Sequence, residues 1–147
     1  MDQASMIQYI IDTFDGAETV TVDDNTFFFY DSERKFPFAT LMTNDVNDQA
    51  SNLNRPSVYR LNVGVSKETY RSLFGAPPAR PGASGIVETG HDFTTLDQLM
   101  PHPVYANMYW VCVLSPSAAT FQTEVQPLLA EAYQTAVGKH AKRAARE

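Results

Sequence analysis

The chain alternates between stretches whose apolar residues recur every three to four positions and stretches in which they alternate or run together. The helical spacing predicts three helices, over residues 3–14, 66–74 and 116–138. Ser115, followed by a proline, is expected to begin the last helix, because serine caps helix N-termini and proline suits the first helical position. Pro127 is expected to kink or split this helix, since proline has no amide hydrogen to donate.

Five other segments have the composition of β-strands. β-Branched and aromatic residues fill positions 19–22 and 26–30, and the Asp-Asp-Asn between them predicts a hairpin. Residues 38–42, 58–63 and 108–114 predict three further strands. Strands accompanied by a long terminal helix are typical of layered α+β folds.

The predicted fold class is therefore α+β, a two-layer α/β sandwich in which helices cover one face of a mainly antiparallel sheet. The predicted order of elements is α-β-β-β-α-β-β-α. Residues 1–138 are expected to form a single domain, and residues 139–147 a basic C-terminal tail that frays. The second face of the sheet is left for solvent, for a binding site or for a dimer interface.

Three connecting segments are less regular. Residues 44–56 are polar and predict a loop, or a short helix around 48–53. Residues 75–90 hold four glycines and three prolines, which indicates a long loop that is either functional or disordered. Residues 93–100 are expected to hold one or two helical turns.

Charge and cysteine content narrow the classes of partner. Residues 1–138 hold seven Lys and Arg and 16 Asp and Glu, so this part of the chain is an acidic body. Its negative charge disfavours nucleic acid as a partner. The basic tail either meets an acidic partner or only complements the dipole of a helix C-terminus. The chain has a single cysteine, which favours a reducing compartment. It has no apolar run of 18 residues that could span a membrane and no basic, apolar leader of the secretory type. We therefore expect a cytoplasmic protein without a membrane partner.

Arg60 and Asn62 are the first candidate site residues, because strand alternation places both on one face of segment 58–63. An arginine there is suited to clamp a carboxylate or phosphate with two hydrogen bonds, while the asparagine orients a second polar group. The alternative is a surface arginine, or one that pairs with Asp31 or Glu33.

His91, Asp92, Asp97 and His102 lie close together in the sequence. A histidine held by a carboxylate is the usual general base, which makes His102 the candidate catalytic residue and His91 a candidate ligand contact. Alternatively, His102 bonds a backbone carbonyl between its two prolines, and His91 lies in a solvated loop. The spacing supports no metal site, and no glycine-rich phosphate loop is present, so no cofactor is expected.

Tyr105, Tyr109 and Trp110 are candidate ligand contacts because aromatic rings stack on aromatic or cationic groups. Tyr109 and Trp110 are expected to point to opposite faces of the sheet, and packing in the core is the alternative for all three. Cys112 lies within an apolar strand and is interpreted as a buried thiol with a raised pKa and no nucleophilic role.

Residues 36–40, 60–75, 99–105, 109–114 and 127–133 carry a resemblance that spans nearly the whole chain. They resemble a bacterial family of uncharacterised proteins of about this length, a domain of unknown function, and the resemblance implies no activity. By topology alone, the predicted order of elements is distantly similar to the YjbR/MmcQ-like proteins, whose fold is α-β(3)-α-β(2)-α in two layers. That likeness implies a role in DNA binding, which the acidic body disfavours.

The sequence leads to two functional hypotheses. In the first, the open sheet face forms a pocket for an anionic or carbonyl-bearing small molecule, with Arg60 as its anchor and His102 orienting it or moving a proton. In the second, the protein is non-catalytic and its aromatic sheet face pairs two copies in a homodimer. The expected state is accordingly a monomer or a homodimer.

Overall fold

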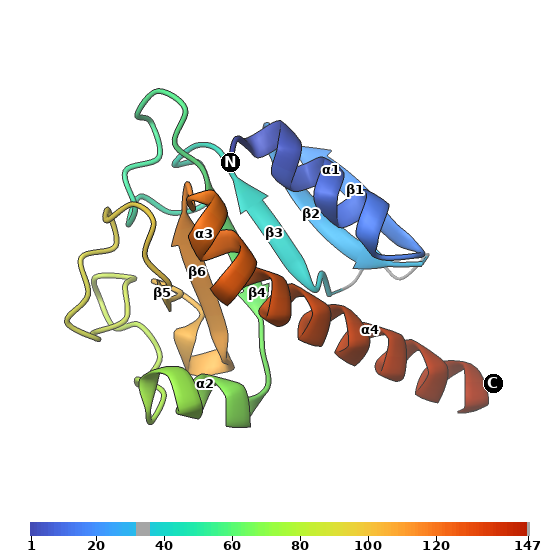
Figure 1. Ribbon diagram of the computed structural model, residues 1–147. Helices are drawn as coiled ribbons and strands as arrows, with labels where there is room; N and C mark the ends of the chain where they lie inside the picture. Colours follow the sequence, from blue (N-terminus) through green and yellow to red (C-terminus); the bar gives the residue numbers. More distant parts are fainter. Residues whose placement is uncertain (32–35, 147) are drawn as a thin grey trace.

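The computed structural model describes residues 1–31 and 36–146, and its centre is an antiparallel sheet of six strands in the order β1-β2-β3-β4-β6-β5. Helices α1 and α4 run across one face of this sheet (Figure 1). The predicted α+β class is confirmed. The elements are α1 (Gln3–Thr13), β1 (Ala17–Val22), β2 (Asn25–Tyr30), β3 (Ala39–Met42), β4 (Arg60–Gly64), α2 (Lys67–Phe74), β5 (Met100–Pro101), the 3₁₀ turn η1 (Ala106–Met108), β6 (Trp110–Leu114), α3 (Ala118–Thr120), the π-helical turn η2 (Phe121–Val125) and α4 (Gln126–Arg146).

The predicted order α-β-β-β-α-β-β-α is wrong, because four strands precede α2. The four segments expected to form strands at 19–22, 26–30, 38–42 and 58–63 do correspond to β1 to β4, all before this helix. After α2 the chain forms the short strand β5 at the end of the region where helical turns were predicted, and β5 pairs with β6. Those turns at 93–100 are wrong: Asp97 has a left-handed backbone with φ of 58°, and its amide donates to the carbonyl of Leu114. Long-range pairing with β6 therefore overrides the local helical pattern.

The hairpin of β1 and β2 is confirmed. Asp23 and Asp24 form its two-residue turn with φ of 53° and 63°. Two consecutive left-handed residues are what a tight hairpin turn requires, and aspartate tolerates this conformation better than most residues. Helix α2 also begins and ends as predicted, with the Ser66 hydroxyl accepting from the Thr69 amide and Gly75 closing the helix.

The start of the last helical segment lies two residues later than predicted. Ser117, not Ser115, is the cap, and its hydroxyl accepts from the amide of Thr120. Ser115 instead accepts from the Tyr59 amide and so ties the end of β6 to the start of β4. Pro127 is accommodated by the π-helical turn directly before it, a widened turn that suits a position without an amide hydrogen. Helix α4 then continues to Arg146, so the described part of the expected frayed tail is helical.

The two faces of the sheet differ in chemistry. Leu61 and Val63 of β4 belong to the apolar core on the side of α1 and α4, together with Phe28, Leu41 and Val113 of the neighbouring strands. Strand alternation places Arg60 and Asn62 on the opposite face, as predicted. There Asn62 lies between Thr40 of β3 and Cys112 of β6, so a row of polar side chains runs along the face without helices.

Candidate functional site: a cleft over the polar sheet face

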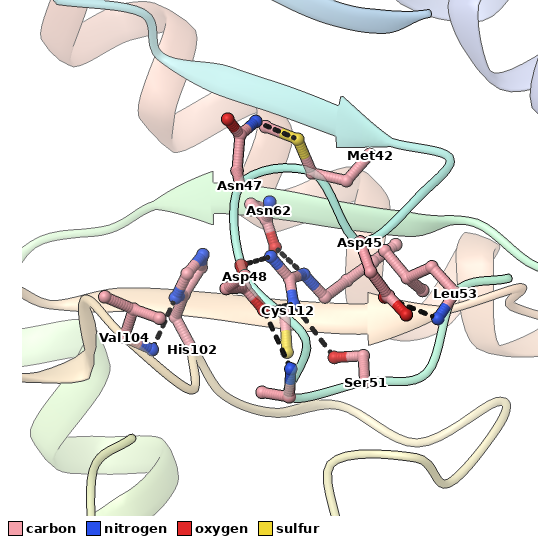
Figure 2. Close-up of polar contacts among 12 residues, drawn as sticks. Met42, Asp45, Asn47, Asp48, Ser51, Leu53, Asn62, His102, Val104 and Cys112 are labelled. Carbon is pink, nitrogen blue, oxygen red and sulfur yellow. Dashed lines mark hydrogen bonds and ion pairs between the residues drawn. The ribbon is translucent and has the colours of Figure 1, made fainter. Parts of the chain in front are cut away.

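Arg60 is the largest fully buried side chain of the described residues, with 1% of its surface exposed. Its guanidinium donates to both carboxylate oxygens of Asp48, at 3.0 and 2.7 Å, and to the hydroxyl of Ser51 at 2.9 Å. Its Nε donates to Asn62 Oδ1 at 2.9 Å. Figure 2 shows Asp48, Ser51 and Asn62 pointing toward one another. The interpretation of Arg60 as a surface residue is therefore wrong.

The partner of Arg60 is also not one that the sequence indicated. Asp31 pairs with His140 at 3.3 Å, and Glu33 lies outside the described residues. Asp48 comes instead from the polar segment 44–56, which is an irregular loop rather than a short helix. Asp48 also accepts from the Ala50 amide, a common aspartate turn, but such a turn does not indicate which side chain the aspartate pairs with.

The carboxyl of Asp48 is held in its charged form. Burial acts to raise its pKa, but hydrogen bonds from Arg60 and the positive charge of Arg60 outweigh this effect, so the pKa lies below its usual value. The pair is therefore ionised at neutral pH and carries no net charge. Asn62 continues the network, since its amide nitrogen donates to Thr40 Oγ1 at 2.9 Å.

His102 lies beside this network with 3% of its surface exposed. Its Nδ1 accepts from the backbone amides of Val104 and Tyr105, both at 3.0 Å, so the ring bonds to amides and not to the predicted carbonyl. Burial lowers the pKa of His102 well below its ordinary value, and the charge of Arg60 lowers it further against the opposing effect of Asp48. A neutral ring whose Nδ1 accepts two hydrogen bonds carries its proton on Nε2.

The second ring nitrogen of His102 is directed toward the cleft. Nε2 makes no hydrogen bond to any of residues 1–31 and 36–146, and no buried side-chain polar atom among these residues lacks a partner. Nε2 is therefore accessible, and His102 lines the cleft. In Figure 2 this nitrogen lies on the side of the ring that faces Asp48 and Asn62. The result is a fixed N–H donor beside the polar network.

The cleft has a volume of about 530 Å³ and lies over the face of the sheet that carries Arg60 and Asn62. Its polar floor is surrounded mostly by apolar side chains. Three of them, Phe36, Tyr105 and Met108, are exposed by 68%, 52% and 62% and form its outer rim. The lining residues are Phe27, Phe36, Pro37, Thr40, Met42, Asn47, Asp48, Arg60, Asn62, His102, Val104, Tyr105, Met108 and Trp110.

Five of the seven residues proposed from the sequence line this cleft: Arg60, Asn62, His102, Tyr105 and Trp110. The other two lie elsewhere. The ring of Tyr109 packs 6.0 Å from that of Tyr70, and the ring of His91 stacks 6.3 Å from that of Phe93.

The Gly/Pro-rich segment 75–90 does not line the cleft, although the amide of Val87 donates to the carbonyl of Pro103 next to the His102 loop. Burial raises the pKa of Cys112 to about 12, so its thiol stays protonated. Over residues 1–31 and 36–146 no group of three His, Cys, Asp or Glu side chains is placed to hold a metal ion. No helix within these residues is both long and apolar enough to cross a bilayer.

Fold and site together define an α+β protein with helices on one face of an antiparallel sheet and a largely apolar cleft with a polar floor on the other. Residues 1–145 match the model of a family of unknown function (DUF6194), and the chain belongs to this family. The resemblance to an uncharacterised family is thereby confirmed.

A crystal structure of a protein from Pseudomonas syringae, determined by the Northeast Structural Genomics Consortium, is similar to this chain. The two are 19% identical and superpose with a TM-score of 0.53 over 92% of this chain and 99% of the other. At this identity the likeness concerns the fold alone. No curated protein matches the chain, and the distant likeness to the YjbR/MmcQ-like proteins stays a prediction.

Asp48→Asn is expected to lower the free energy of unfolding by about 3 kcal/mol at neutral pH, because it leaves the buried Arg60 without its counter-charge. The exposed Asp24→Asn removes the same charge and is the control. In the wild type the contribution of Asp48 is present above the pKa of an unfolded aspartate, about 3.9, and is lost as the pH falls through the lower pKa of the folded state. Urea unfolding measures both effects, and equal stability of the two variants would contradict the assignment.

The neutral state of His102 predicts a second pH dependence. The unfolded chain protonates this ring below about pH 6.5, whereas burial keeps the ring neutral in the folded protein, so the free energy of unfolding decreases as the pH is lowered through this value. His102→Asn, which keeps an acceptor near the position of Nδ1, should lose this component, and His91→Gln should retain it. Nitrogen NMR of the ring should find Nδ1 unprotonated; a proton on Nδ1 would refute the tautomer.

Proposed function

We propose that the protein binds a small molecule that has an apolar body and an uncharged acceptor, such as a carbonyl oxygen, at its polar end. The observation that carries this proposal is the composition of the cleft: apolar walls around a floor in which Arg60, the only cation among the described lining residues, is paired with Asp48. Clefts of this size with few, fixed polar groups are the usual form of small-molecule sites.

The floor favours a neutral acceptor over an anion. Four of the five guanidinium hydrogens of Arg60 are engaged by Asp48, Ser51 and Asn62. An incoming carboxylate at this position would also approach the charge of Asp48, which is unfavourable at close range. The sequence suggested either an anionic or a carbonyl-bearing ligand. At this end of the cleft the carbonyl-bearing ligand is therefore preferred.

His102 supplies the donor that such an acceptor needs. With Nδ1 occupied by two backbone amides, the ring presents an N–H at Nε2 and has no free lone pair toward the cleft. It is suited to orient or polarise a carbonyl oxygen and unsuited to remove a proton. We therefore propose binding rather than the acid–base role considered for His102 from the sequence.

Filling the cleft tests this proposal. Val104→Phe adds an aromatic ring to the cleft wall, whereas Val22→Phe makes the same change at an exposed position of β1 that does not line the cleft. With hexanamide as a probe, titration calorimetry should show binding by the wild type and the Val22 variant, and at least tenfold weaker binding by the Val104 variant. Hexanoate should bind less tightly than hexanamide to all three. Equal binding of hexanamide by both variants would place the site elsewhere.

The homodimer is the second candidate function, and the exposed rim of Phe36, Tyr105 and Met108 is the observation that favours it. An apolar group of this kind at a surface is also found at protein interfaces. The ligand proposal predicts a monomer in sedimentation velocity at micromolar concentration. A dimer that Met108→Glu dissociates, while the outward-facing Leu96→Glu does not, would instead support association through the rim.

A further inference from the structure

The carboxylate of Asp48 keeps one acceptor position that the described residues do not fill. Its Oδ1 accepts from Arg60 Nη1 at 3.0 Å and from the Ala50 amide at 3.2 Å, whereas its Oδ2 accepts only from Arg60 Nη2, at 2.7 Å, among those residues. Each oxygen of an ionised carboxylate has room for about two hydrogen bonds. The side chain of Asp48 is 17% exposed and lines the cleft, which leaves this position for a bound molecule.

The N–H of His102 lies near this acceptor. Both residues line the cleft, and in Figure 2 Nε2 of the ring lies on the side that faces Asp48. Besides the effects of burial, Asp48 acts to raise the pKa of His102, and the histidine acts to lower the pKa of Asp48, so the two groups are close enough to interact electrostatically. Within the described part of the chain no hydrogen bond joins them. The floor thus presents a donor and an acceptor that are not used by each other.

The neighbouring polar groups of the floor already have partners. The amide nitrogen of Asn62 donates to Thr40 Oγ1 at 2.9 Å, and the amide oxygen accepts from Arg60 Nε at 2.9 Å. A hydrogen bond to an ionised acceptor is shorter and stronger than one to a neutral amide or hydroxyl oxygen. A ligand N–H at this end of the cleft is therefore stabilised most by Asp48.

We propose that the polar end of the ligand is a primary carboxamide or a lactam, whose carbonyl oxygen accepts from His102 Nε2 and whose N–H donates to Asp48 Oδ2. In both groups a carbonyl oxygen and an N–H lie on the same edge, which suits a donor and an acceptor close together. This proposal rests on the function proposed above and adds the second half of the ligand's polar group. The apolar body extends along β4 toward Trp110, which pairs with Gly64 at the opposite end of the strand from Arg60.

Three probes of nearly equal size separate the acceptor from the donor. Hexanamide carries both groups, 2-heptanone has a methyl group in place of the NH2, and N-methylhexanamide keeps one N–H that its trans amide directs away from the carbonyl oxygen. The fluorescence of Trp110, the only tryptophan of the chain and a lining residue of the cleft, reports the binding of all three. The wild type should bind hexanamide about tenfold more tightly than either of the others, because a hydrogen bond to a charged group contributes roughly this factor.

Asp48→Asn removes the charged acceptor and leaves a single side-chain oxygen, which Arg60 needs. This variant should bind hexanamide and 2-heptanone with nearly equal affinity. Asp24→Asn makes the same substitution at an exposed position of the turn between β1 and β2, and it should keep the preference for hexanamide. Asp48→Asn is also expected to weaken the fold, and the comparison of the three probes on the wild type decides the question by itself if the variant does not fold.

The outcomes separate this proposal from the proposed function. A wild type that binds 2-heptanone as tightly as hexanamide would overturn the carboxamide and leave the proposed function standing, because an acceptor bonded to His102 would then be sufficient. An unchanged preference in a folded Asp48→Asn variant would also overturn the role of Asp48. A failure of all three probes to bind would overturn both proposals.

Discussion

The ion pair of Arg60 and Asp48 is the interaction on which the polar half of this structure depends. A buried guanidinium without a counter-charge is costly enough that a protein places one only where a carboxylate meets it with good geometry. Both carboxylate oxygens of Asp48 accept hydrogen bonds from the guanidinium of Arg60, and Ser51 and Asn62 accept two more from it. The pair thereby holds the loop 44–56 against the sheet face that has no helix, and this loop forms one side of the cleft.

The same pair acts on the chemistry of His102. Its two charges influence the ring in opposite directions, with burial and Arg60 favouring the neutral form and Asp48 favouring the charged one. Two backbone amides then select which nitrogen carries the proton. The donor in the cleft is thus a consequence of local backbone geometry within the segment 102–105, and it does not require a carboxylate behind the ring as in a catalytic pair.

Periodicity predicted most of the elements because the helices and the longer strands follow it. It failed where a long-range hydrogen bond decides the local conformation, as at Asp97, whose amide donates to the carbonyl of Leu114. The capping prediction at Ser115 failed for a similar reason, because its hydroxyl accepts from the distant Tyr59 amide. For the site, alternation in β4 was sufficient to place Arg60 and Asn62 on one face. Asp48 was not predictable in the same way, because no local pattern indicates which acidic residue of a polar loop will cover a strand 12 residues further on.

The cations of the basic C-terminal segment differ in their surroundings, and these differences are visible only in the folded structure. Cations near a helix C-terminus interact favourably with the helix dipole wherever they face, so the sequence alone does not separate one from another. The geometry does: Lys139 and Arg143 line a second cleft, while Lys142 and Arg146 do not line it. The fold therefore separates cations that the sequence presents as equivalent: two of them, four residues apart on α4, lie beside Trp110 at the end of the sheet, and the others do not.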